Sequence, residues 1–486
     1  MSGLIRRVSW PLFVVAGLVL GMALGQVLRR LPAFAHFGEV AMLCPLGGAV
    51  MGYVIGRAGA RVTIASTVHG SASFATERQI QASLGAGEGL IVGRENRRHG
   101  RLLRYSGPAH LLTIAPTRSG KGVGAIIPNL LTAERSILCI DPKGENARIA
   151  ARARHRLGPV HILDPFGVSG APTAAFNPLD ALNPESLDLA EDAALVADAL
   201  VYDPPGQIGE AHWNEEAKAL IGGLILHVVT DPGQPSNLAT VRDLLTLAPD
   251  KFYDLLRAMQ QSPAAGGLVA RAANRHLGKS EREATSVLSS AQRHTHFLDS
   301  QRMVQVLSRS DFRFEDLKAG TATVFLVLPP ERLATHARWL RLLVAQAINA
   351  MARSPIRPAA PVLFLLDEFA ALGRLEPVER AFGLMAGYGL QLWPILQDKH
   401  QFWNVYGDRA GTFIANAGVI QVFNVADVET ASWVSKSIGA TTVTYQTSGT
   451  SVSNSPGRFL LNQTTKGVST SVHRNWCERP TCSGTV

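Results

Sequence analysis

The feature of this sequence that most constrains the fold is an apolar run that leads into a Gly-Lys-Gly loop and then into a helical pattern. The apolar run covers residues 111–115, and the helical pattern covers residues 123–131. The residues that we predict to surround a bound phosphate are Pro116, Thr117, Arg118, Ser119, Gly120, Lys121, Gly122 and Val123. Backbone N–H groups of such a loop and the positive end of the helix attract an anion, and Lys121 reaches the β- and γ-phosphates. The pattern therefore predicts a phosphate-binding loop between a strand and a helix.

The loop departs from the usual pattern at two positions. Ala115 stands in place of the first glycine, and Gly122 stands where a serine or threonine hydroxyl normally binds Mg²⁺. We expect the metal to take another oxygen, from Thr117, Ser119 or an extra water. The alternative is an ordinary strand-to-helix turn that happens to contain Gly-Lys-Gly.

Two acidic residues follow a second buried run. Val362–Leu366 is apolar, and Asp367 and Glu368 come directly after it. Carboxylates at the end of a buried strand are costly unless a cation is present. We expect Asp367 to hold Mg²⁺ through water and Glu368 to polarise the water that attacks ATP. In the alternative interpretation the two acids only cap the next helix.

A neutral amide follows a third run. Gln397 comes after the apolar residues 390–396, so it can contact the γ-phosphate or the attacking water. The alternative is a solvent-facing strand end. We therefore predict Lys121, Glu368 and Gln397 as catalytic residues, Asp367 as the metal residue, and ATP with Mg²⁺ as the ligands.

Short apolar runs predict an α/β fold with a mostly parallel sheet covered on both faces. The predicted strands are residues 111–115, 136–141, 160–164, 323–328, 362–367, 390–396 and 418–423, and residues 89–107 read as a β-hairpin with a basic tip. Lys121 and Asp367 are separated by about half of the chain, yet we expect their strands to be neighbours. An insertion must therefore lie between them. Helical patterns between about residues 180 and 310 supply it as an all-helical domain.

The N-terminal part predicts a membrane anchor. Residues 10–28 carry no charge, and residues 37–56 carry only Glu39, so each run is long enough for one transmembrane helix. Because ATP is cytoplasmic, we expect both ends of this helical hairpin to face the cytoplasm. A cleaved signal peptide is the alternative for the first run.

Composition excludes two classes of protein. Hydrophobic residues make up 46% of the 486 residues, which is too many for a disordered chain, and four cysteines without repeated spacing exclude a disulfide scaffold. Lys and Arg outnumber Asp and Glu by 47 to 38, which favours nucleic acid or anionic lipid as a partner. For the tail, residues 441–473, we expect either a flexible end or a shortened natural or cloned chain.

Taken together, these motifs resemble the coupling-protein ATPases of type IV secretion and conjugation systems, the TraG/TraD-type family. The resemblance covers roughly residues 1–450. It rests on the N-terminal runs, the loop at 116–122, and the segments Asp-Pro-Lys-Gly-Glu at 141–145, Phe-Asn-Pro-Leu-Asp at 176–180, Leu-Asp-Glu-Phe at 366–369 and Ala-Gly-Tyr-Gly at 386–389. In this family a glycine after the loop lysine is familiar. An arginine finger from a neighbouring subunit is also expected, and Arg374 and Arg380 are candidates.

The resemblance implies a homo-hexamer on the bacterial inner membrane with a RecA-like P-loop motor domain. It implies ATP-driven delivery of DNA with a relaxase-type protein, or of effector proteins, to the inner-membrane components of a type IV secretion channel. The expected domains are a hairpin at 1–56, a linker and the first part of the nucleotide-binding domain at 57–180, the helical domain at 181–310, and the second part with its tail at 311–486. Two alternatives stay open. One is a membrane-anchored substrate receptor with little or no activity, and the other is a chromosome-segregation DNA translocase.

Overall fold

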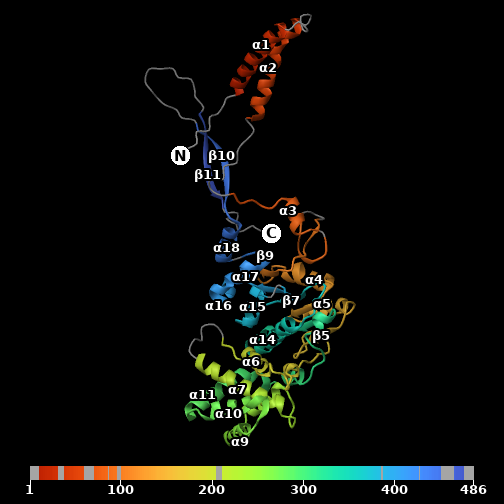
Figure 1. The fold of residues 1–486 in the computed structure, drawn as a ribbon, viewed down its shortest axis with the longest axis vertical. Helices are drawn as coiled ribbons and strands as arrows, with labels where there is room; N and C mark the ends of the chain where they lie inside the picture. Colours follow the sequence, from red (N-terminus) through yellow and green to blue (C-terminus); the bar gives the residue numbers. More distant parts are fainter. Residues whose placement is uncertain are drawn as a thin grey trace, which may run out of the picture. The chain divides into compact units, whose positions relative to one another are not determined.

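The computed structural model describes residues 10–30, 38–59, 71–85, 87–95, 100–203, 211–384, 387–425, 427–449 and 465–474. The chain divides into two units, which are considered one at a time. The larger comprises Phe74–Ser437 with Arg479–Val486, and the smaller comprises Met1–Ser73 with Ile438–Glu478. Figure 1 labels the elements along the chain.

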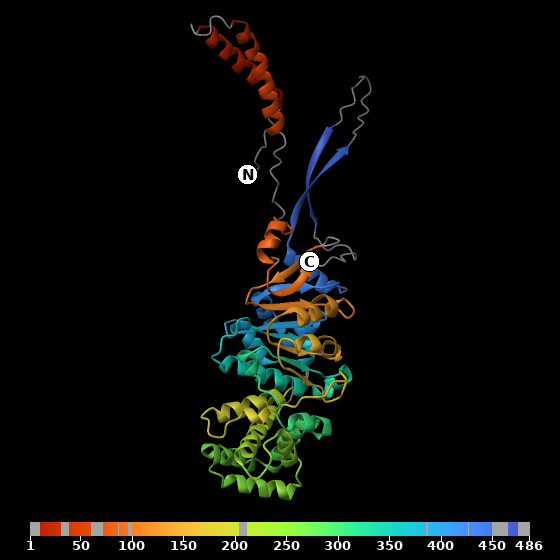
Figure 2. The same cartoon turned by 90° about the vertical axis from the view of Figure 1, so that its right-hand side faces the viewer.

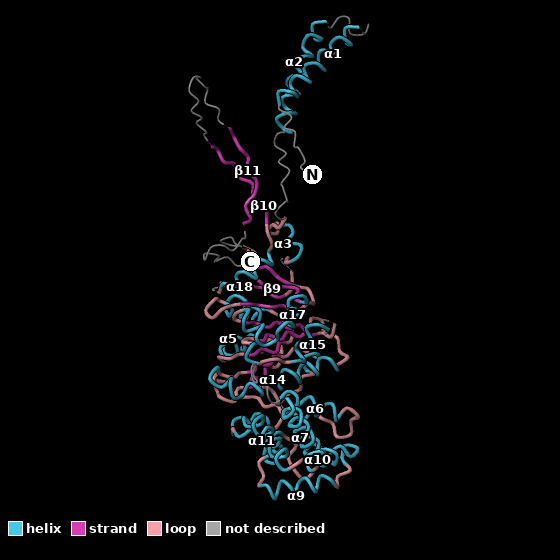
Figure 3. The backbone as a smooth tube through the Cα atoms, turned by 90° about the vertical axis from the view of Figure 1, so that its left-hand side faces the viewer, coloured by secondary structure: helices cyan, strands magenta, loops and turns pink. Residues whose placement is uncertain are grey.

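A seven-stranded parallel sheet forms the centre of the larger unit (Figure 3). Its strands are β3 (His110–Ile114), β4 (Ile137–Ile140), β5 (Val160–Leu163), β6 (Thr323–Leu326), β7 (Val362–Leu366), β8 (Leu390–Leu396) and β9 (Ala417–Val422). The order across the sheet is β5-β6-β4-β7-β8-β3-β9, and every neighbouring pair is parallel. All residues of β4, β6, β7 and β8 are buried, which is why these strands are continuous apolar runs in the sequence. The predicted parallel sheet is confirmed.

One topological prediction is wrong. The strands that precede Lys121 and Asp367, β3 and β7, are not neighbours, because β8 pairs with both of them. An apolar run shows that a strand is buried, but it carries no information on which strand lies beside it.

Helices cover both faces of the sheet. Alternate residues of a strand point to opposite faces, so Leu138 and Ile140 of β4 enter one hydrophobic core and Ile137 and Cys139 enter the other. The first core contains α14 (Pro330–Arg353), α15 (Glu376–Leu384), α16 (Lys399–Tyr406) and α17 (Ala410–Asn416). The second contains η2 (Gly122–Ile126), α4 (Ile127–Thr132) and α5 (Glu145–Arg154).

The predicted hairpin is present as β1 (Leu90–Arg94) and β2 (Leu102–Tyr105), which pair antiparallel. Its basic tip falls partly outside the described residues. Asn129 of α4 accepts from the Ile91 amide at 2.7 Å and donates to the Ile91 carbonyl at 2.8 Å, which ties the hairpin to the helix. Two further helices of this unit are α3 (Glu77–Ser83) and α18 (Val428–Ile438), except that Ile438 itself is assigned to the smaller unit.

Between β5 and β6 the described residues form helices and no strand. We call residues 189–307 the helical block. It contains α6 (Leu189–Leu200), α7 (Ala211–Thr230), α8 (Leu238–Leu245), α9 (Pro249–Gln260), α10 (Leu268–Leu277), α11 (Glu281–Thr295) and α12 (Gln301–Leu307). In Figure 2 its yellow and green helices lie together beyond the sheet, and α14 contacts α6 from the sheet side. After the block, α13 (Asp316–Ala319) leads into β6.

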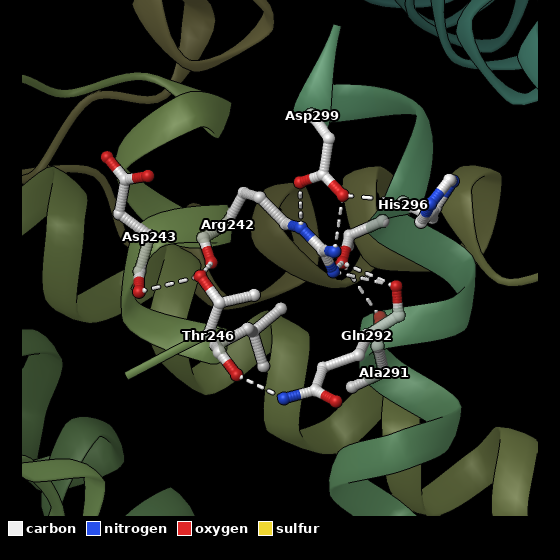
Figure 4. A network of polar contacts seen from close by, with 9 residues as sticks. Arg242, Asp243, Thr246, Ala291, Gln292, His296 and Asp299 are labelled. Carbon is white, nitrogen blue, oxygen red and sulfur yellow. Dashed lines mark hydrogen bonds and ion pairs between the residues drawn. The ribbon is translucent and has the colours of Figure 1, made fainter. Parts of the chain in front are cut away.

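A buried arginine holds two helices of the block together (Figure 4). Arg242 of α8 donates to both oxygens of Asp299, at 2.7 and 2.8 Å, and to the Gln292 carbonyl at 2.8 Å. Gln292 of α11 donates in return to the Leu245 carbonyl of α8 at 2.7 Å. These contacts fix α8 against α11 and the turn that follows it.

The smaller unit contains the helices α1 (Trp10–Arg30) and α2 (Gly38–Gly59) and the strands β10 (Thr441–Gly449) and β11 (Thr465–Arg474). The helices pack backbone to backbone, because a Cβ added to Gly17 would lie 2.1 Å from the Gly48 carbonyl oxygen. The strands pair antiparallel over their whole length, although we expected no strand pair in this segment.

The predicted membrane anchor at residues 10–28 and 37–56 is wrong. In the described part of the chain, no helix combines the length and the apolar character that crossing a bilayer requires. The predicted two-span location in the bacterial inner membrane, with both termini cytoplasmic, is therefore wrong as well.

Candidate nucleotide site

The four side chains that the sequence singles out for chemistry lie together. Lys121 Nζ is 2.7 Å from Asp367 Oδ1 and 3.0 Å from Glu368 Oε1. Gln397 Nε2 donates to Glu368 Oε2 at 2.9 Å. The lysine follows β3, the acids follow β7 and the glutamine follows β8, so three parallel strands bring them to one edge of the sheet. Such an edge is where α/β proteins usually bind ligands.

The loop from Pro116 to Val123 has the backbone conformation of a tight turn into a helix. Arg118 has φ 63° and Gly120 has φ 90°, both in the left-handed region. The Ser119 amide donates to the Pro116 carbonyl at 3.1 Å, and the Ala115 amide donates to the Leu396 carbonyl at 2.7 Å. Thr117, Arg118 and Val123 are exposed, and Lys121 is the N-cap residue directly before the π-helical turn η2. The loop therefore lies open at the sheet edge, anchored through β8.

Two features of the loop fit a bound phosphate and metal. Ser119 Oγ is buried and has no hydrogen-bond partner among the described residues, which is costly for a hydroxyl. At Gly122 an added Cβ would meet no atom within 4 Å, so the missing hydroxyl leaves space next to Lys121. A phosphate or a hydrated cation in that space would satisfy the serine.

Burial and pairing act against each other at the acid pair. Burial lowers the pKa of Lys121, but the neighbouring carboxylates of Asp367 and Glu368 outweigh it and hold that pKa above its usual value. Burial raises the pKa of Asp367, and Lys121 opposes this effect. Because Lys121 stays protonated, the cluster holds one cation between two carboxyl groups.

The backbone of Glu368 is left-handed, with φ 52° and ψ 39°. A residue with a Cβ adopts this conformation only where its surroundings enforce it. The Glu368 amide donates to Asp367 Oδ1 at 3.0 Å, so the two acids also fix each other.

The Asp141–Glu145 segment at the end of β4 forms a turn, with the Gly144 amide 3.3 Å from the Asp141 carbonyl. The Asp141 side chain is buried and accepts from the Ala147 amide at 2.9 Å, which starts α5. Burial raises its pKa, and the nearby Asp367 adds to the effect. Asp141 therefore has a structural part in the turn and lies close enough to feel the charge of Asp367.

The two arginine-finger candidates follow the acids but lie on the surface. Arg374 pairs with Glu379 at 3.4 Å, and Arg380 is exposed. In the described part of this chain, neither contacts Lys121, Asp367 or Glu368.

Sequence analysis missed Arg341 of α14. This buried side chain donates to the Leu372 carbonyl at 2.5 Å and to the Arg374 carbonyl at 2.9 Å, in the segment directly after the acid pair. An arginine inside an amphipathic helix carries no signal of burial, so the sequence could not identify it.

Comparison with known proteins identifies the family of the chain. Residues 65–471 match the family described as type IV secretory system conjugative DNA transfer. The conjugal transfer protein TraG of Escherichia coli is 31% identical, and the match covers 77% of this chain and 65% of TraG. VirD4 of Agrobacterium fabrum (strain C58) is 32% identical, covering 68% of this chain and 49% of VirD4. The chain thus spans about two thirds or less of these relatives.

Solved structures of the plasmid coupling protein TrwB have the same fold. TrwB in complex with the GTP analogue GDPNP has a TM-score of 0.59 at 18% identity, covering 76% of this chain and 83% of TrwB. TrwB in complex with ADP and Mg²⁺ has a TM-score of 0.57 at 18% identity, covering 76% and 84%. The chain therefore shares the fold of TrwB, and its described residues form a parallel sheet covered by helices. Since the family match extends over most of the sequence, the chain belongs to the type IV secretory system conjugative DNA transfer family.

Proposed function

We propose that this chain is a coupling ATPase that recruits DNA with a relaxase-type protein, or effector proteins, and drives them into a type IV secretion channel. The observation that carries the proposal is the contact of Lys121 with Asp367 and Glu368, at 2.7 and 3.0 Å, from strands half a chain apart. Family membership supports it and favours transfer over chromosome segregation. The similarity to TraG, a conjugal transfer protein, and to TrwB, a plasmid coupling protein, supports it as well.

In this proposal the loop from Pro116 to Val123 holds the phosphates of ATP, and Lys121 contacts the β- and γ-phosphates. Asp367 would hold Mg²⁺ through water, and the ion supplies charge neutralisation on the phosphates when it is bound. Of the candidate oxygens that replace the missing hydroxyl, Ser119 Oγ is favoured, because it is buried and unpartnered whereas Thr117 is exposed.

Glu368 and Gln397 would act on the attacking water. An incoming triphosphate offers the Lys121 ammonium new anionic partners, which frees the Glu368 carboxylate to accept a proton from water. Gln397 already donates to Glu368 at 2.9 Å, so it orients that carboxylate and lies within reach of the same water. Hydrolysis then depends on positioning and charge neutralisation.

The molecular organisation belongs to the same proposal. We assign nucleotide binding to residues 57–180 and 311–486 and contact with the transferred substrate to the helical domain at 181–310. The active form would be a homo-hexamer, with an arginine from a neighbouring subunit completing the site. Lys and Arg would contact DNA phosphates without regard to sequence, and the secretion channel's components would be the protein partners.

The experiment is ATP hydrolysis by the full-length chain with Mg²⁺, with and without single-stranded DNA, beside Lys121→Ala and Glu368→Gln. Both variants should lower kcat by about 100-fold or more, because each removes a group that acts on the reacting atoms. If both variants hydrolyse ATP at the wild-type rate, the site assignment is wrong.

Gly122 favours one second candidate, a substrate receptor with little or no hydrolysis, because the hydroxyl that usually binds Mg²⁺ is missing and its space is open. A folded, oligomeric wild-type chain that shows no hydrolysis with DNA present would favour this receptor.

A further inference from the structure

Arg341 joins the turn of the acid pair to the rest of the molecule. It lies in the middle of α14 with 4% of its surface exposed. Its Nη1 donates to the carbonyls of Leu372 and Arg374, at 2.5 and 2.9 Å. These residues end the turn that begins at Glu368 and contains η6 (Phe369–Leu372). Arg341 therefore holds the far end of the turn whose first residue carries the carboxylate.

The shape of this turn needs support from outside. Within it, the Ala371 amide donates to the Glu368 carbonyl at 2.9 Å and the Gly373 amide to the Ala370 carbonyl at 3.0 Å. Glu368 is nevertheless left-handed, a conformation that a non-glycine residue leaves when its surroundings loosen. Removing Arg341 would thus let the carboxylate of Glu368 move away from Lys121 and Gln397.

The same guanidinium also contacts the helical block. Its Nε donates to the carbonyl of Ala199 in α6 at 3.3 Å, and its Cζ lies 4.1 Å from the centre of the Tyr202 ring. Tyr202 packs directly on the turn, because a Cβ added to Gly373 would lie 1.9 Å from its hydroxyl oxygen. Arg338, one helical turn before Arg341, donates to the Tyr202 carbonyl at 2.8 Å.

Among the described residues, no carboxylate pairs with Arg341. Burial lowers its pKa to about 10, so it is still protonated at neutral pH. A buried cation that has only carbonyl and ring partners is an expensive way to fill space, and a leucine or methionine would pack as well. The charge of Arg341 is explained if its hydrogen bonds to the carbonyls of Ala199, Leu372 and Arg374 are needed for function.

We propose that Arg341 is a positioning residue that holds Glu368 in its active placement and, through Tyr202, makes that placement depend on the helical block. Movement of the block under its transferred substrate then changes the rate of hydrolysis. This inference rests on the proposed ATPase function and adds a link between substrate contact and chemistry.

The test uses the full-length chain with ATP, Mg²⁺ and single-stranded DNA, and it measures kcat, KM and nucleotide affinity. Arg341→Met should lower kcat at least tenfold while KM and the affinity for a fluorescent ATP analogue change less than threefold. Arg341→Lys, which keeps the charge and one set of donors, should recover part of that loss. Tyr202→Leu should bring the ratio of DNA-stimulated to basal kcat close to one.

Arg154→Met is the matched control. Arg154 is also buried, with 1% of its surface exposed, and it donates to the carbonyls of Ala133 and Arg135 at the amino-terminal edge of the sheet, away from the acids. Burial lowers its pKa to about 10 as well. The kcat of Arg154→Met, and its ratio of DNA-stimulated to basal kcat, should stay within threefold of the wild-type values.

Three results would overturn the inference: an unchanged kcat in Arg341→Met, an equal loss in Arg154→Met, or a full DNA response in Tyr202→Leu. If Arg341→Met does not fold, Arg341→Lys and Tyr202→Leu decide the question alone. A wild-type chain without Lys121-dependent hydrolysis overturns the proposed function together with this inference. If the wild type hydrolyses ATP normally and Arg341→Met has the same kcat, only this inference is overturned.

Discussion

Lys121 contacts both acids of the site, and this pairing determines what a ligand must do to bind. Its side chain is 15% exposed, against 13% for Asp367 and 28% for Glu368, so water screens the cluster only in part. A triphosphate that reaches Lys121 must compete with two carboxylates, and Mg²⁺ lowers that barrier by giving Asp367 a new partner. Nucleotide affinity should therefore depend strongly on the metal.

The absent hydroxyl at Gly122 can be restored. Because an added Cβ meets no atom within 4 Å, Gly122→Ser should fold with an unchanged melting temperature. If the space holds the metal, the new hydroxyl adds a ligand, and the Mg²⁺ concentration for half-maximal hydrolysis should fall about three- to tenfold. Gly122→Ala, with the same Cβ but no hydroxyl, is the control. Equal Mg²⁺ dependence in both variants would place the metal elsewhere.

Because of the buried His294 ring, we expect the free energy of unfolding to fall in acid. Burial, together with Arg338 and Arg293, lowers its pKa from 6.5 to about 3, while Asp203 opposes the shift. The folded state keeps the ring neutral and the unfolded state protonates it. The contribution of the neutral His294 ring to the free energy of unfolding is thus complete above pH 6.5, and it is lost as the pH falls towards 3. Between pH 6.5 and 4.5 the free energy of unfolding should fall by about 2–3 kcal/mol more in the wild type than in His294→Gln. Parallel urea titrations across this range check it, and identical pH profiles would contradict it.

At the scale of elements, strand prediction succeeded because its signal is local. β3, β4, β6, β7 and β8 are fully buried, so they are visible as apolar runs, and the edge strands β5 and β9 are only partly buried. The helical patterns between about residues 180 and 310 have the same local origin, and the described residues of the helical block form helices α6 to α12.

The Arg242 contacts in Figure 4 give a prediction for the helical block. Arg242→Met leaves Asp299, the Gln292 carbonyl and Thr295 Oγ1 without their donor. Since Asp299 is 48% exposed and can turn to water, we expect a loss of about 2 kcal/mol, below the full cost of a buried pair. Urea unfolding of the full chain measures this loss. Asp299→Ala should cost about half as much, and a change below about 0.5 kcal/mol in Arg242→Met would show that the contacts contribute little.

For the whole molecule, the sequence predicted which side chains come together, and their roles at a nucleotide stay predictions. Lys121, Asp367, Glu368 and Gln397 were chosen because they follow apolar runs that end at one edge of the sheet, and in the structure they lie in contact. The position of β8 between β3 and β7, and the role of Arg341, depend on packing between distant segments. The membrane prediction was wrong because it relied on uncharged length alone, whereas no helix in the described part of the chain combines the length and the apolar character of a membrane span.

The measurement that tests the central claim most directly is the affinity of the full-length chain for ATP. Titration calorimetry measures this affinity with and without Mg²⁺. If the Lys121 loop and the acid pair form one site, Lys121→Ala should weaken binding at least tenfold in both conditions. Asp367→Asn should remove most of the increase in ATP affinity that Mg²⁺ causes in the wild type. Glu368→Gln should still bind ATP. Unchanged affinity in Lys121→Ala, or an undiminished effect of Mg²⁺ in Asp367→Asn, would show that these residues do not bind one nucleotide.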